Sequence, residues 1–157
     1  MNNRLSYGNK AKNLEYVAKN TDIEIPYFKE IYFDDLNNIE NIVDSFSQKI
    51  IIRSNSSSED KEFSSSAGKY LSIGPIERND LETIKKSWEM VVGSYEEQDN
   101  QSVIFQNYIE NAKSVSVLTS YKVGSDSAYR TFSTYYGSET DAITSGLSLI
   151  HISEPRD

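Results

Sequence analysis

The stretch IIIRSNSSSEDKEFSSSAG, from Ile50 to Gly68, contains the most informative pattern in the chain. It begins with a run of isoleucines, which is typical of a short buried strand. The strand delivers Arg53 into a serine-rich loop that ends at Gly68. A guanidinium group presents a planar fork of donors that matches phosphate oxygens, and glycine lets backbone N–H groups approach them. The pattern is suited to a phosphate-binding loop. Composition alone nevertheless favours the alternative, a serine-rich surface linker that follows a strand.

Apolar residues recur at helical spacing in several segments around this stretch. One segment covers residues 10–20, and another can be capped by Asp34 or Asp35. A further one begins with Asn79 and Glu82 in the arrangement of a capping box. The faces that we expect to be buried consist of Ala11, Leu14, Val17 and Ala18, of Leu36, Ile39, Val43 and Phe46, and of Leu81, Ile84, Trp88 and Val91 or Val92.

Strand-like patterns are mixed with these helices and dominate the second half of the chain. Pro26 favours an edge strand or a loop nearby, and Gly74-Pro75 predicts the end of a strand that starts at Lys69. The strand-like ranges are 23–33, 49–53, 69–73, 102–109, 114–123 and 129–136. This order of elements fits an α+β or α/β domain rather than a helical bundle or a β-sandwich.

Composition limits the classes of protein to consider. A chain of 157 residues can form one ordinary domain with its own core. Its net charge of −8 argues against a general binder of nucleic acids or anionic membranes. The chain has no cysteine, so disulfides and thiolate metal sites are excluded. No apolar run could span a bilayer and no signal peptide precedes the first motif, so we expect a cytoplasmic protein.

The C-terminal segment LSLIHISEPRD, Leu147 to Asp157, resembles the translation of a sequencing adapter. We therefore expect a domain over residues 1–146 and a non-native tail over residues 147–157. A real amphipathic terminus is the alternative. The only histidine, His151, lies in this segment, so we give it no catalytic role.

The serine-rich stretch resembles a signature of the ATP-binding domain of the phosphoenolpyruvate synthase and pyruvate phosphate dikinase family. Arg53-Ser54, Glu59-Asp60 and Ser66-Ala67-Gly68 are similar to that family's V-R-S-S, E-D and S-F-A-G. The resemblance implies an ATP-grasp-like fold, here a partial one of α+β class, with a mixed sheet and flanking helices. The nucleotide would lie in a cleft between subdomains.

Two more motifs occur in the family's order. Residues 7–14, YGNKAKNL, are similar to G-G-K-A/G-x-N-L, with Asn9 in place of the second glycine. Val103-Ile104-Phe105-Gln106 is similar to the V-x-V-Q strand. Together the motifs extend the resemblance over residues 7 to 146.

The resemblance implies roles for particular residues of this chain. Lys10 and Arg53 would contact ATP phosphates, and Arg53 would act catalytically by neutralising charge on the transferred phosphoryl group. Gly68 and Ser72 would line the phosphate pocket, and Gln106 would face the nucleotide. Each has an ordinary structural alternative, namely an exposed lysine, an arginine paired with a nearby acid, a turn glycine, a strand serine and an outward strand glutamine.

The function implied is that of the N-terminal, ATP-binding part of a phosphotransferase. The intact family enzyme passes a phosphoryl group from ATP to a histidine on a downstream domain, and then to an acceptor such as pyruvate. ATP and Mg²⁺ would be the cofactors, with the acidic Mg²⁺ ligands beyond the end of this chain. We expect the fragment alone to be inactive, with the phosphohistidine domain as its partner and no nucleic-acid or membrane partner. The alternative is a noncatalytic nucleotide-binding or protein-interaction module on the same scaffold.

Overall fold

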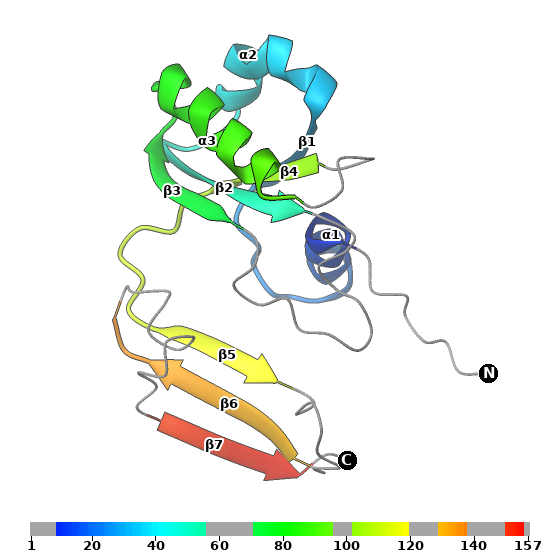
Figure 1. Ribbon diagram of the computed structural model, residues 1–157. Helices are drawn as coiled ribbons and strands as arrows, with labels where there is room; N and C mark the ends of the chain where they lie inside the picture. The colour runs from blue at the N-terminus through cyan, green and yellow to red at the C-terminus, as the bar shows by residue number, and fades with distance from the viewer. Residues whose placement is uncertain (1–8, 56–70, 96–101, 120–128, 138–149, 156–157) are drawn as a thin grey trace, which may run out of the picture. The chain divides into compact units, whose positions relative to one another are not determined.

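The computed structural model describes residues 9–55, 71–95, 102–119, 129–137 and 150–155. It divides the chain into two compact units, Met1–Tyr108 and Ile109–Asp157. Among the described residues, each unit contains its own sheet and the helices belong to the first unit (Figure 1). The combination of helices and sheets confirms the α+β class. The boundary predicted at Gly146 lies outside the described residues.

The sheet of the first unit has four strands in the order β1-β4-β2-β3. Their bounds are β1 Phe28–Tyr32, β2 Lys49–Asn55, β3 Ser72–Glu77 and β4 Ser102–Asn107. Every pairing within it is antiparallel, so the prediction of a mixed sheet is wrong for these strands. The physical reason is the position of β2. Strands β3 and β4 run in the same direction, but β2 lies between them and pairs with both.

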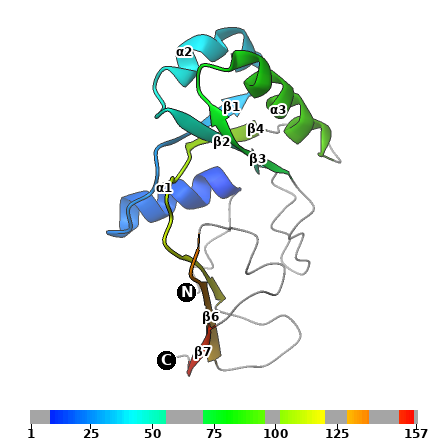
Figure 2. The same cartoon turned by 90° about the vertical axis from the view of Figure 1, so that its left-hand side faces the viewer.

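The helices of this unit cover both faces of the sheet. Helices α2 (Ile39–Val43) and α3 (Leu81–Gly93) lie on one face, and α1 (Lys10–Asn20) lies on the other (Figures 1 and 2). A 3₁₀ helix, η1 (Phe33–Asn38), leads into α2. The helix predicted over residues 10–20 is confirmed.

Two predicted helix starts differ from the structure. The N-cap of α3 is Asp80 rather than Asn79, since Asp80 Oδ1 accepts the Thr83 N–H at 3.0 Å. Asp35 does not cap α2 but accepts the Tyr32 N–H at 3.0 Å, at the end of β1. In both places a carboxylate accepts a backbone N–H at the end of a helix or a strand. The residue or the element involved differs from the predicted one.

The core lies between the sheet and the helices α2 and α3. Its buried members are Ile31, Ile39, Ile42, Val43, Phe46, Ile50, Ile52, Ile76, Ile84, Trp88, Val91, Tyr95, Val103 and Phe105. The predicted inward faces of the second and third helical segments are therefore confirmed at Ile39, Val43, Phe46, Ile84, Trp88 and Val91. On α1 the prediction holds only for Ala11, because Leu14 and Val17 are half-buried and Ala18 is exposed.

Strand β3 contradicts the predicted break at Gly74-Pro75. The strand runs from Ser72 to Glu77 through both residues. Proline is tolerated there because β3 is an edge strand, where a missing N–H removes no ladder bond inside the sheet. The pairing with β2 shifts register between Ile50 and Ile52. Glycine suits this point, since a Cβ on Gly74 would lie 3.0 Å from the Ile51 Cα.

The second unit contains a three-stranded antiparallel sheet in the order β5-β6-β7. Its strands are β5 Val115–Thr119, β6 Tyr129–Tyr135 and β7 Ile150–Pro155. The strands predicted at 114–123 and 129–136 are confirmed over the bounds of β5 and β6, and residues 120–123 lie outside the described residues. Strand β7 falls within the segment that we interpreted as a non-native tail, and it pairs with β6. In the ranges described in both units, no helix has the length and apolar character needed to cross a membrane.

Candidate functional site

Arg53, on β2, is next to a predicted site residue on each adjoining strand. Its Nη1 donates a hydrogen bond to Gln106 Oε1 of β4 at 3.0 Å. Ser72 of β3 is its direct partner in the strand register, so both side chains lie on the same face of the sheet. Gln106 is only 7% exposed, Arg53 is half-buried and Ser72 is exposed. The structure thus brings these three residues together from distant parts of the sequence.

Lys10 reaches the same end of β2 from α1. Its Nζ donates to Ser54 Oγ at 3.0 Å. Ser54 directly follows Arg53, and because successive side chains of a strand alternate, the two point to opposite faces. Lys10 therefore contacts the residue that follows Arg53 in β2, on the opposite side of the strand from the Arg53 side chain. The remaining predicted residue, Gly68, lies outside the described residues, as do Glu59 and Asp60.

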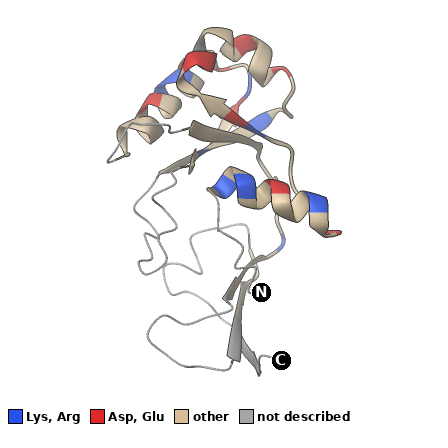
Figure 3. Ribbon diagram, turned by 90° about the vertical axis from the view of Figure 1, so that its right-hand side faces the viewer, with Lys and Arg blue, Asp and Glu red and all other residues tan. Residues whose placement is uncertain are grey.

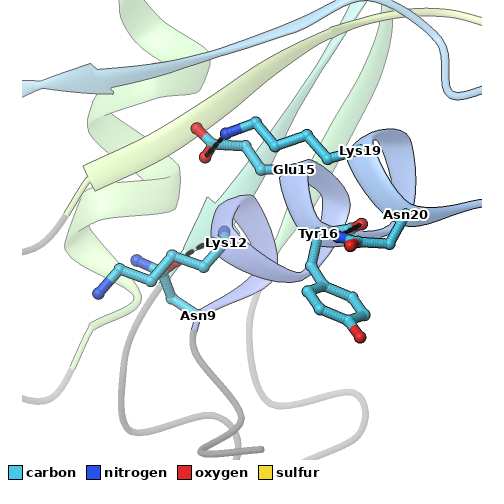
Figure 4. A network of polar contacts seen from close by, with 6 residues as sticks. All are labelled: Asn9, Lys12, Glu15, Tyr16, Lys19 and Asn20. Carbon is cyan, nitrogen blue, oxygen red and sulfur yellow. Dashed lines mark hydrogen bonds and ion pairs between the residues drawn. The ribbon is translucent and has the colours of Figure 1, made fainter.

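The start of α1 is capped by Asn9, the residue that replaces a glycine of the family motif. Asn9 Oδ1 accepts the Lys12 N–H at 3.1 Å (Figure 4). An asparagine here satisfies one of the four backbone donors that a helix start leaves open, which a glycine side chain cannot do. The departure from the motif thus has a structural reason in the folding of α1.

Behind Lys10, a buried polar group ties three strands to the start of α1. Asn55 Oδ1 accepts the Ala11 N–H at 2.8 Å, and Asn55 Nδ2 donates to Glu30 Oε1 and Ser102 Oγ, both at 2.7 Å. Ser102 Oγ also donates to Glu30 Oε1 at 2.5 Å. Asn9 Nδ2 approaches the same carboxylate oxygen at 3.4 Å. We call Asn9, Glu30, Asn55 and Ser102 the Asn55 cluster.

Tyr95, which follows α3, bonds to the backbones of β2 and β4 where their pairing ends, beside this cluster. Its hydroxyl accepts the Asn55 N–H at 2.9 Å and donates to the Ser102 carbonyl at 2.7 Å. The backbone of the last paired residues is therefore satisfied through a side chain. The sequence motifs gave no indication of a role for Tyr95, Glu30, Asn55 or Ser102.

Charge near the site has both signs. Figure 3 shows lysines toward both ends of α1, with an acidic residue between them. On β1, burial raises the pKa of the Tyr32 hydroxyl above its ordinary value, and the neighbouring Glu30 carboxylate raises it further. Within the described ranges, no three His, Cys, Asp or Glu side chains gather in an arrangement that could hold a metal ion.

A separate polar hollow lies between η1, α2 and α3. Its lining consists of Asn37, Asn38, Ile39, Glu40, Asn41, Lys85 and Glu89. None of the predicted site residues is among them, so the hollow is distinct from the residues gathered around β2.

Comparison of the chain with protein-family models, with curated proteins and with solved structures finds no match.

Proposed function

We propose that this chain supplies the phosphate-contacting side of a partial ATP-grasp-like domain, similar to that of phosphoenolpyruvate synthase. The observation that carries the proposal is the grouping of Arg53, Gln106 and Ser72 across three neighbouring strands. Lys10 reaches the end of the same central strand. The Arg53 guanidinium and the Ser72 hydroxyl lie on the same face of the sheet, and both are donors suited to phosphate oxygens.

The chemistry proposed for these residues is positioning and charge neutralisation, which are the main needs of phosphoryl transfer. The Gln106 carbonyl holds one end of the Arg53 guanidinium, and this bond orients the planar fork. Lys10 would add a compact positive charge near the start of a helix, where the helix dipole favours an anion. ATP with Mg²⁺ would supply the phosphoryl group, and the acidic Mg²⁺ ligands would come from outside this chain.

In the intact protein, we propose a cytoplasmic phosphotransferase. The phosphoryl group would pass from ATP to a histidine of a downstream domain, and from there to an acceptor such as pyruvate. The part of the site present in this chain would bind nucleotide without completing the reaction. Nucleotide affinity, rather than turnover, is therefore the property to measure.

The test is an ATP titration of the parent chain and of Arg53→Lys. Lysine keeps the charge but loses the two-pronged contact, so we expect the dissociation constant to rise about ten- to a hundredfold, for a loss of roughly 1.5–3 kcal/mol. Arg78→Lys is the matched control, because Arg78 donates to the carbonyls of Asp44 and Phe46 and not to the site. Equal affinities for the parent and Arg53→Lys would contradict the proposal and favour the noncatalytic module.

A further inference from the structure

Helix α1 is joined to the sheet by hydrogen bonds at the start of the helix. Asn9 bonds to Glu30, Lys10 to Ser54, and the Ala11 N–H to Asn55. Further along, the side chains of Lys19 and Asn20 bond within the helix itself (Figure 4). Ala11 is the only fully buried residue of α1, and Leu14 and Val17 are half-buried, so the helix lacks a fully buried apolar face. Polar contacts at its start therefore add to what holds the helix in place.

Among these contacts, Asn55 is the most completely enclosed and the most specific. It is 1% exposed, and both ends of its amide are used. The oxygen accepts from Ala11, while the nitrogen donates to Glu30 and Ser102. Only an amide offers an acceptor and two donors at this reach. The Glu30 and Ser102 bonds fix the orientation of the amide, and its oxygen then fixes the position of the Ala11 backbone.

We propose that Asn55 is a positioning residue. By accepting the Ala11 N–H, it places Lys10 at the end of β2, where the lysine bonds to Ser54, the residue after Arg53. Ala11 follows Lys10 directly, so releasing its backbone frees the lysine as well. The effect on nucleotide binding rests on the function proposed above. The effect on the helix does not, because it concerns only the contacts between α1 and the sheet.

The first measurement is amide hydrogen exchange by NMR in the full chain, without nucleotide. In Asn55→Ala we expect the Ala11 amide to exchange about tenfold faster, the scale of one lost hydrogen bond. The amides of Ile52 and Phe105, in the central ladder, should keep their protection. Asn107→Ala is the matched control: Asn107 Oδ1 also accepts a backbone N–H, from Ser47 at 2.8 Å, but away from α1.

The second measurement separates positioning from a general loss of structure. ATP affinity is compared for Lys10→Ala, Asn55→Ala and the double variant. If Asn55 acts through Lys10, each single variant should weaken binding by about tenfold and the double variant by no more than either, since residues that act as a unit are not additive. A merely structural role would give additive losses, which would overturn the proposal.

The outcomes remain separable if one part fails. Unchanged exchange at Ala11 in Asn55→Ala would overturn the positioning role. A parent chain that binds no ATP would refute the proposed function, and the exchange result would still decide whether Asn55 holds α1. If Asn55→Ala does not fold, Ser102→Ala is measured instead. It removes a single bond of the Asn55 amide and should accelerate the same amide by a smaller factor.

Discussion

Gly74 illustrates how one residue sets the spacing of two strands. A Cβ at this position would meet the Ile51 Cα at 3.0 Å, and backbone cannot move aside as a flexible side chain can. We expect Gly74→Ala to destabilise the first unit by about 1–3 kcal/mol, the usual cost of overpacking. The measurement is urea unfolding followed by Trp88 fluorescence. Gly93→Ala is the control, because nothing lies within 4 Å of its Cβ and no loss is expected. Equal effects of the two substitutions would contradict this reasoning.

Single residues also show what the sequence could and could not predict about the site. Lys10, Arg53, Ser72 and Gln106 were found through motifs, and the structure gathers them around β2. Glu30, Asn55, Ser102 and Tyr95 were not found. Their bonds join residues between 7 and 72 positions apart, and the register of antiparallel strands creates those meetings. A motif read along one segment carries no information about such register.

At the scale of elements, α3 depends on its N-cap. Hydrogen bonds from the Thr83 backbone and hydroxyl lower the pKa of Asp80 below its ordinary value of 3.8. A carboxylate whose folded pKa is lowered stabilises the fold above its unfolded pKa, and the contribution is lost as pH falls through the folded pKa. The melting temperature of the parent should therefore fall relative to Asp80→Asn below about pH 4. Asparagine also caps a helix but does not titrate.

The measurement is a pair of thermal unfolding curves at several pH values. Above about pH 5 the difference in melting temperature between the parent and Asp80→Asn should stay constant, since the carboxylate is ionised in both folded and unfolded chains. If the difference in melting temperature stays constant down to about pH 3, the charge of Asp80 contributes nothing to the stability of the cap.

The elements that periodicity predicted best are those with one buried face. Ile84, Trp88 and Val91 recur at helical spacing and line the buried side of α3, so the pattern and the packing agree. Strand β3 was misplaced because Pro75 usually ends a strand, and only its position at the sheet edge makes the residue acceptable. Edge position is a property of the whole sheet and cannot be read from the segment.

At the scale of the whole molecule, the α+β class followed from the order of helical and strand-like patterns, but the division into two units did not. The division falls between Tyr108 and Ile109, directly after β4. No proline or glycine marks it. Asn111 adopts a left-handed backbone with φ of 57°, which asparagine tolerates better than most residues. Strand patterns before and after this turn look alike, so only the pairing shows that they belong to different sheets.

This division predicts how the chain responds to loss of its last segment. Trp88, the only tryptophan, belongs to the core of the first unit, whereas β7 pairs with β6 in the second. Deleting residues 147–157 should therefore change the free energy of unfolding seen by Trp88 fluorescence by less than about 1 kcal/mol. Phe105→Ala provides the positive control, because truncating this fully buried ring should cost about 3–5 kcal/mol with the same probe. A comparable loss on deleting the segment would mean that the second unit stabilises the first, and the segment would then have to be treated as part of the fold.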